Sequence, residues 1–174
     1  MKPGGELSGT ADPADLPALG APSRSHLALG AAGELIVAGA FALLGYQVYR
    51  PLADDRGVDL VVDVGRGRHV MVQVKSIQAK SGYVFMPKDT FALEPWVALS
   101  LAVFESPTDI APTLFLFPSL VWAEPKAPFT SYEYEQKKSK PEYGLNLRKA
   151  WRTELSGWRA TPDHVASVLD AAKS

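Results

Sequence analysis

The feature that most constrains this chain is a pair of alternating segments, residues 57–64 (GVDLVVDV) and 69–77 (HVMVQVKSI). Apolar and polar residues alternate along both segments, as they do in half-buried strands, and Gly65-Arg66-Gly67 between them indicates a tight turn. The two segments therefore predict a β-hairpin. Side chains two residues apart share a face of a strand, so Gln73 and Lys75 are expected to lie together.

The register of this hairpin decides where Asp59 lies. A two-residue turn at Arg66-Gly67 would put Asp59 opposite Val74, whereas a three-residue loop puts it opposite Gln73. We predict the three-residue loop, with Gly67 left-handed in a bulge. The acid is then expected on the same face as the glutamine.

A helix is predicted to precede the hairpin, capped by Ser25 and ended by Gly45. Glu34 shares its face with Val37 and Phe41, so its carboxylate lies on a partly apolar stripe. An unpaired buried carboxylate costs several kcal/mol, roughly enough to neutralise it. Glu34 therefore needs a cationic partner, for which Lys75 or a bound metal ion is expected.

The composition restricts the metal chemistry. The 174 residues include no cysteine and only three histidines, which show no zinc-ligand spacing, so carboxylates and Mg²⁺ or Mn²⁺ are expected. The chain is 47% hydrophobic and 21% charged, which is typical of a folded protein. Its net charge of −1 is unevenly placed, because residues 126–174 carry 9 Lys and Arg against 6 Asp and Glu. A nucleic-acid-binding function is permitted by this distribution and not required by it.

The rest of the chain predicts one α/β domain over residues 25–174, with a core at 26–122 and a basic, aromatic-rich extension at 123–174. Residues 1–24 are expected to form a disordered tail, and no signal peptide or membrane span is expected, which favours a cytoplasmic protein. Residues 88–96 read as a short helix or loop. Further strands are expected near residues 47–51, 83–87, 97–105 and 113–118, and a last helix opens at Thr161-Pro162-Asp163.

The extension allows two interpretations. Its tyrosines and tryptophans could stack on bases while its cations contact phosphates, or the aromatic side chains could pack on the sheet beneath a rim of lysines. Trp96 and Trp122 are assigned to the core. The cations chosen as candidate nucleic-acid contacts are Lys80, Lys137, Lys138, Lys140 and Arg148.

The segment from Gly33 to Ser76 resembles the PD-(D/E)xK nuclease superfamily, and within it the Mrr-type restriction endonucleases and Holliday-junction-resolvase-like proteins. The resemblance implies a restriction-endonuclease-like αβββαβ core with a mixed sheet flanked by helices. It matches Glu34 to the first-helix acid, Asp59 to the metal-binding aspartate, and Gln73-Val74-Lys75 to the (E/Q)xK tripeptide. Two departures are an Arg56-Gly57-Val58 sequence where a proline would precede the aspartate, and Gln73 in place of glutamate; the Mrr-type branch shows both.

The function implied by the resemblance is metal-dependent endonucleolytic cleavage of DNA, in restriction, repair or defence against mobile DNA. Glu34, Asp59 and Gln73 would hold Mg²⁺ or Mn²⁺, and Lys75 would complete the catalytic set. Alternatives remain open. Glu34 could be a surface acid, Asp59 could pair with Arg56, and the fold could be an inactive module that binds nucleic acid or a protein. RNA as substrate and a homodimer are also compatible with the sequence.

Overall fold

The computed structural model describes residues 25–53, 56–106, 108–134, 139–147 and 151–171. The tail at residues 1–24 lies outside this part of the chain. The main sheet has five strands in the order β1-β2-β3-β5-β6, and a small antiparallel sheet has the order β4-β8-β7. The strands of the main sheet are β1 (Gln47–Tyr49), β2 (Leu60–Gly65), β3 (Arg68–Gln78), β5 (Val97–Phe104) and β6 (Thr113–Pro118). Those of the small sheet are β4 (Tyr83–Pro87), β7 (Phe129–Tyr132) and β8 (Glu142–Asn146).

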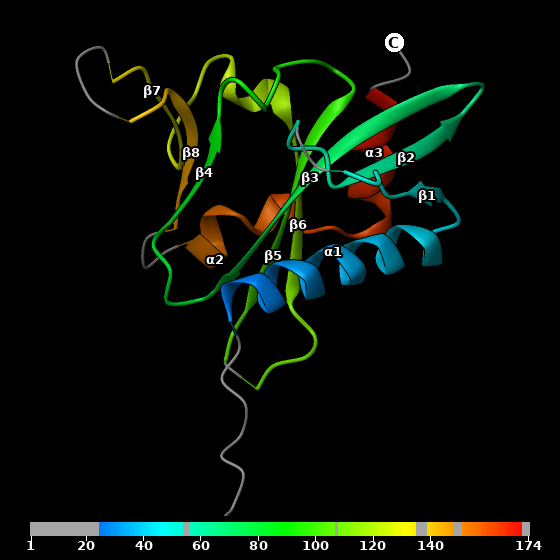
Figure 1. Cartoon of the computed structure of the whole chain (residues 1–174), viewed down its shortest axis with the longest axis horizontal. Helices are drawn as coiled ribbons and strands as arrows, with labels where there is room; N and C mark the ends of the chain where they lie inside the picture. Colours follow the sequence, from blue (N-terminus) through cyan, green and yellow to red (C-terminus); the bar gives the residue numbers. More distant parts are fainter. Residues whose placement is uncertain (1–24, 54–55, 107, 135–138, 148–150, 172–174) are drawn as a thin grey trace, which may run out of the picture.

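The main sheet is mixed, because β3 and β5 are parallel and its other neighbouring pairs are antiparallel. The helices belong to its two faces (Figure 1). They are α1 (His26–Leu43), η2 (Ser119–Trp122), α2 (Trp151–Glu154), η3 (Ser156–Trp158) and α3 (Pro162–Ala171). The expected mixed α/β sheet with flanking helices is confirmed.

One face of the main sheet is covered by α1 and α3. Val37 and Phe41 of α1 and Leu169 of α3 pack with the alternating valines of β2 and β3 in one buried cluster. The predicted caps are present: the Ser25 hydroxyl accepts from the Ala28 N–H at 3.1 Å, and the Thr161 hydroxyl accepts from the His164 N–H at 3.3 Å. These helix starts follow the local capping rules.

The opposite face of the main sheet packs against the small sheet and the short helices. Leu99, Leu101, Phe115 and Phe117 meet the inner residues of the small sheet in a second cluster. Trp122 is buried there, and its indole N–H donates to the Gly144 carbonyl at 2.8 Å. Trp122 therefore belongs to the core as predicted, but Trp96 does not, since 45% of it is exposed at the turn before β5.

The crossover between β3 and β5 corrects one expectation. The αβββαβ order places a helix there, but residues 79–96 form β4 and turns instead. Pro87 and Pro95 leave too few residues between them for a stable helix, and β4 finds hydrogen-bond partners in β8. The second helix of the expected core is therefore replaced by a strand of the small sheet.

Helix α1 is long and apolar enough, by length and composition alone, to cross a membrane. In this fold it packs on the sheet through Leu29, Val37 and Phe41, while Leu27 and Leu43 on its outer side are exposed. A helix that is apolar all round is usually covered on all sides. The outer side of α1 departs from that rule.

Candidate functional site

The hairpin has the register predicted from its glycines. Leu60 pairs with Val72 and Asp63 with His69, the alignment expected for the three-residue loop. The predicted three-residue loop is wrong, however, because Gly65 pairs with Arg68 and the turn itself has only two residues, Arg66 and Gly67. A bulge between Asp63 and Gly65, and not at Gly67 as predicted, restores the predicted register. Residues 65, 66 and 67 all have positive φ angles (87°, 58° and 74°), which twist the turn to fit the two strands.

Asp59 lies where β2 and β3 part. Its N–H donates to the Val72 carbonyl at 3.1 Å, and the paired ladder ends next to it at Leu60. Its carboxylate Oδ2 accepts from the Val74 N–H at 2.5 Å. The side chain thus occupies the place that the backbone of β2 would fill if the two strands continued together.

From Val74 onward, β3 pairs with β5 alone among the described strands. The N–H and C=O of one residue in a strand point to the same side, so the Val74 carbonyl also points toward the start of β2. A carboxylate and a main-chain carbonyl are therefore brought to one place by the parting of two strands. This part of the site stands in the plane of the sheet.

Gln73 is 94% buried on the face opposite α1. Its amide lies against Gly57 and Thr90, so closely that a Cβ at Gly57 would come within 2.8 Å of the Gln73 Nε2. Its Oε1 is buried and has no hydrogen-bond partner within the described part of the chain. An unsatisfied buried amide oxygen is costly, which marks Gln73 as a residue available to a ligand.

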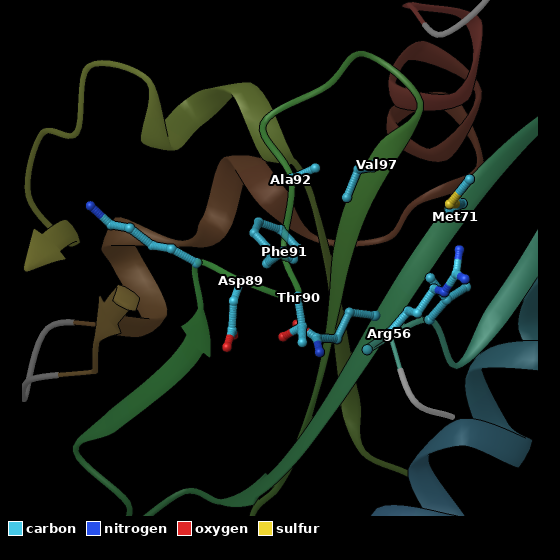
Figure 2. Close-up of a pocket in the computed structure, with 11 residues that line it drawn as sticks. Arg56, Met71, Asp89, Thr90, Phe91, Ala92 and Val97 are labelled. Carbon is cyan, nitrogen blue, oxygen red and sulfur yellow. The ribbon is translucent and has the colours of Figure 1, made fainter. Parts of the chain in front are cut away.

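A cavity of about 280 Å³ opens beside Gln73. Figure 2 shows Arg56 and Asp89 on different sides of this cavity, with Thr90 between them and Met71 and Val97 toward its apolar end. The residues from Lys88 to Ala92 belong to the crossover that replaced the expected helix. The cavity therefore joins the QxK strand to the small sheet.

Lys75 alternates with Val74 and Ser76 on β3, so it projects to the same face as Gln73. Its side chain is half-buried. Val72 and Val74 belong to the apolar cluster beneath α1, on the other face. The polar tripeptide residues are thus separated from the main apolar layer by the strand itself, as the alternation predicted.

Glu34 has a different partner from the one expected. The Arg50 Nη2 donates to the Glu34 Oε2 at 2.6 Å, and the two side chains are 49% and 26% exposed. Arg50 follows Tyr49, which pairs with Val61, so continued pairing would place Arg50 opposite Leu60, the residue after Asp59. The cation that satisfies Glu34 is therefore Arg50 and not Lys75, and it holds Glu34 toward the end of β2 where Asp59 lies.

Asp59 and the Gln73-Val74-Lys75 tripeptide lie at the start of β2 and the middle of β3, directly linked through the hydrogen bond to Val74. Glu34 lies on α1 and is paired with Arg50. Within the described ranges, no group of three or more His, Asp or Glu side chains is arranged to hold a metal ion. Any cation at this site would need the amide of Gln73 and main-chain oxygen as well as carboxylates.

The candidate nucleic-acid contacts fall into two groups. Lys80 is exposed in the turn after β3, and the Lys140 ammonium lies 2.7 Å from Asp89 at the edge of the cavity. Lys137, Lys138 and Arg148 lie outside the described residues. Of the aromatic residues in the extension, Trp151 is buried and Tyr143 and Trp158 pack on the same apolar cluster, so packing on the sheet accounts for these three.

Comparison with known proteins bears on the fold. No family model matches the chain, and no curated protein matches it. The chain is similar in structure to the bacterial homing endonuclease I-Ssp6803I, with a TM-score of 0.50 and 17% identity over 86% of this chain and 97% of the endonuclease. It is also similar to the Holliday junction resolvase Hjc of Archaeoglobus fulgidus, with a TM-score of 0.48 and 12% identity over 81% of this chain and 95% of the resolvase.

The homing endonuclease has a restriction-endonuclease-like fold, so the fold implied by the sequence resemblance is confirmed. Sequence reasoning missed Arg50 and the cavity wall at Lys88–Ala92. Arg50 could have been found from its position directly after a short strand beside the acid strand. The cavity wall had no local signal, because it depends on how β4 pairs with β8, nearly 60 residues away.

Proposed function

We propose that this protein is a divalent-metal-dependent endonuclease that hydrolyses phosphodiester bonds in DNA. The observation that carries the proposal is the Asp59 carboxylate held on the Val74 N–H where β2 and β3 part. That contact joins the acid strand to the Gln73-Val74-Lys75 tripeptide within the confirmed fold. The similarity to a homing endonuclease supports the same class of reaction.

The oxygen atoms of the site fit a hard cation such as Mg²⁺ or Mn²⁺. Asp59 would be the principal ligand, the Val74 carbonyl would be a second, and the unpartnered Oε1 of buried Gln73 would be a third. When bound, such an ion neutralises charge on the scissile phosphate and lowers the pKa of a water molecule. Glu34 remains a proposed contributor, directly or through water, and Arg50 positions it.

Lys75 would supply a positive charge from the protein, in addition to that of the metal ion. Among the described residues, no carboxylate pairs with its ammonium group, so its charge is not already neutralised. A half-buried ammonium beside the phosphate would stabilise the negative charge that develops as the phosphodiester is attacked. It would also orient the attacking water.

An inactive nucleic-acid-binding or protein-binding module is the second candidate. The ion pair between Arg50 and Glu34 favours it, because a cationic side chain already satisfies the carboxylate that a metal would need. The two candidates differ in one measurable property. Only the endonuclease requires cleavage that depends on both the metal and Asp59.

The decisive experiment incubates the purified protein with Mg²⁺ or Mn²⁺ and a panel of DNA substrates: supercoiled plasmid, linear duplex and a four-way junction. Cleavage is expected in the wild type and is expected to fall at least about 100-fold in Asp59→Asn and Lys75→Ala. Competition between DNA and RNA oligonucleotides tests the choice of substrate.

Asp63→Asn is the matched control. Asp63 lies on β2, four residues after Asp59, but its Oδ1 accepts from the Gly65 N–H at 2.6 Å in the turn. Its loss should leave cleavage intact. Equal cleavage by wild type, Asp59→Asn and Lys75→Ala would contradict the proposal, as would absence of cleavage in all of them with every substrate and metal.

A further inference from the structure

The outer face of the small sheet, on the side away from the main sheet, carries aromatic side chains. Strand alternation buries Val84, Met86, Leu145 and Phe129 on the inner face. The other side chains therefore point outward. The residues of this outer face are Tyr83, Phe85, Pro87, Thr130, Tyr132, Glu142, Gly144 and Asn146.

The aromatic rings of this face form two stacked pairs. Tyr83 and Phe85 on β4 have ring centroids 6.5 Å apart and planes inclined by 18°. Tyr132 on β7 and Tyr134 just beyond it have centroids 5.6 Å apart and planes inclined by 26°. Phe85 is 50% exposed and Tyr132 is 41% exposed. Each pair thus consists of one half-buried ring and one ring open to solvent.

A single carboxylate holds the two pairs in place. The hydroxyls of Tyr83 and Tyr134 both donate to the Glu142 Oε1, at 2.8 Å and 3.0 Å. Gly144 lies under the Tyr83 ring, where a Cβ would come within 2.5 Å of the Tyr83 Cζ. A glycine at this position lets the tyrosine lie across β8. Glu142 thus fixes Tyr83 and Tyr134, and each of these rings stacks on an exposed one, Phe85 or Tyr132, which lowers the entropic cost of binding at the exposed rings.

Two lysines at the border of this face, within the described residues, are already paired. Lys88 forms an ion pair with Glu133, and Lys140 forms one with Asp89 at 2.7 Å. Phosphate groups would therefore gain little from these lysines. The contribution of this face to nucleic-acid affinity would therefore come mainly from its rings.

We propose that the outer face of the small sheet binds unpaired bases of single-stranded nucleic acid, with Phe85 and Tyr132 each stacking on one base. Flat, exposed, preorganised rings are what unpaired bases stack on, whereas duplex DNA keeps its bases inside. The inference rests on the proposed nuclease function where it names a substrate class for that function, which is nucleic acid with a single-stranded segment near the cleavage site.

The proposal is tested with full-length protein in EDTA, so that binding is measured without cleavage. The probe is a fluorescein-labelled oligothymidylate of about 20 nucleotides, longer than one such site requires, and the signal is fluorescence anisotropy. We expect Phe85→Ala and Tyr132→Ala each to weaken binding roughly 5- to 100-fold. Phe85→Trp and Tyr132→Phe, which keep a ring, should bind nearly as the wild type does.

Three controls separate the possible causes. Leu120→Ala removes an exposed apolar side chain on η2, outside this face, and should not change binding. An abasic oligonucleotide of equal length keeps the phosphates without the bases and should bind poorly. Asp63→Asn changes a carboxylate of the β2–β3 turn and should bind as the wild type does; because EDTA prevents metal-dependent cleavage, the stacking result stands independently of whether the protein cleaves DNA.

Undiminished oligothymidylate binding by both alanine variants would overturn the proposal, and so would equal binding of the abasic strand. Sedimentation velocity tests the main alternative, in which a second copy of the chain covers this face. If Phe85→Ala or Tyr132→Ala lowers the sedimentation coefficient of the free protein, this face is an interface between copies of the chain. Cleavage of duplex DNA without measurable stacking would contradict this inference alone and leave the proposed nuclease function in place.

Discussion

Gly33 sets how closely α1 can approach β3. A Cβ at this position would overlap the Ser76 hydroxyl and come within 3.0 Å of the Ser76 Cβ. Gly33→Ala should therefore destabilise the fold by about 1–3 kcal/mol, partly offset by the better helix propensity of alanine. Chemical denaturation measures this change in the free energy of unfolding.

Gly39→Ala is the matched control, because no atom lies within 4 Å of the Cβ it would gain. It should stabilise the protein by about 0.5–1 kcal/mol, since alanine reduces the conformational entropy of the unfolded chain and favours the helix. Combining Gly33→Ala with Ser76→Ala should recover part of the loss. Equal effects of the two single glycine substitutions would show that α1 is not held at the distance described.

The partner of Glu34 shows where prediction from residues stops. Helical spacing placed Glu34 beside Val37 and Phe41, and the cost of a buried carboxylate required a cation. The sequence could not choose between Lys75 and Arg50, because the choice depends on the register of β1 against β2. A three-residue strand carries too little pattern to specify that register.

At the scale of elements, the β2–β3 turn carries strain that can be removed. Arg66 has a φ of 58°, a conformation that costs a non-glycine residue about 1 kcal/mol. Arg66→Gly should therefore stabilise the fold slightly, by about 0.5 kcal/mol, and Gly67→Ala should destabilise it by about 1 kcal/mol. Thermal unfolding followed by circular dichroism checks both signs. Stabilisation by Gly67→Ala would contradict the turn conformation.

The hydrogen bonds that Tyr83 and Tyr134 donate to Glu142 in the small sheet should respond to alkaline pH. Burial raises the pKa of Tyr83 above its usual value of 10.0, and the Glu142 carboxylate raises it further. The folded state therefore keeps the proton longer than the unfolded state does, so this contribution to stability is full below pH 10 and is lost as pH rises above it. Unfolding of wild type and Tyr83→Phe from pH 8 to 11 measures it. An equally steep decline in the variant would contradict the assignment.

The elements differ in how far the sequence determined them. The β2–β3 hairpin and its register were predicted correctly, but the register comes from a bulge between Asp63 and Gly65 combined with a two-residue turn, which the sequence did not indicate. The strand at residues 83–87 was also predicted, but its place in a second sheet was not, because β4 is stabilised by pairing with β8, which lies beyond residue 140. The same long-range pairing assembles the aromatic outer face from segments that share no local pattern.

At the scale of the whole molecule, the main sheet separates two kinds of surface. Helices α1 and α3 cover one face with an aliphatic layer, and the small sheet covers much of the other. Gln73 lies on the second face, beside the cavity that leads toward the small sheet. The proposed cleavage site and the proposed base-stacking face are therefore connected through Lys88 and Asp89 without passing through the core.

Metal binding should appear as a change in the stability of the whole fold. A ligand that binds only the folded state stabilises it by about 2.7 kcal/mol at 100 times its Kd, a rise of roughly 5–11 °C in Tm for a chain of this length. Mg²⁺ should produce such a rise in the wild type and not in Asp59→Asn. Gln73→Glu should unfold more easily without metal, because it buries a carboxylate at a site that is 94% buried. With saturating Mg²⁺ it should gain more than the wild type, and equal gains in all three proteins would show that the ion binds elsewhere.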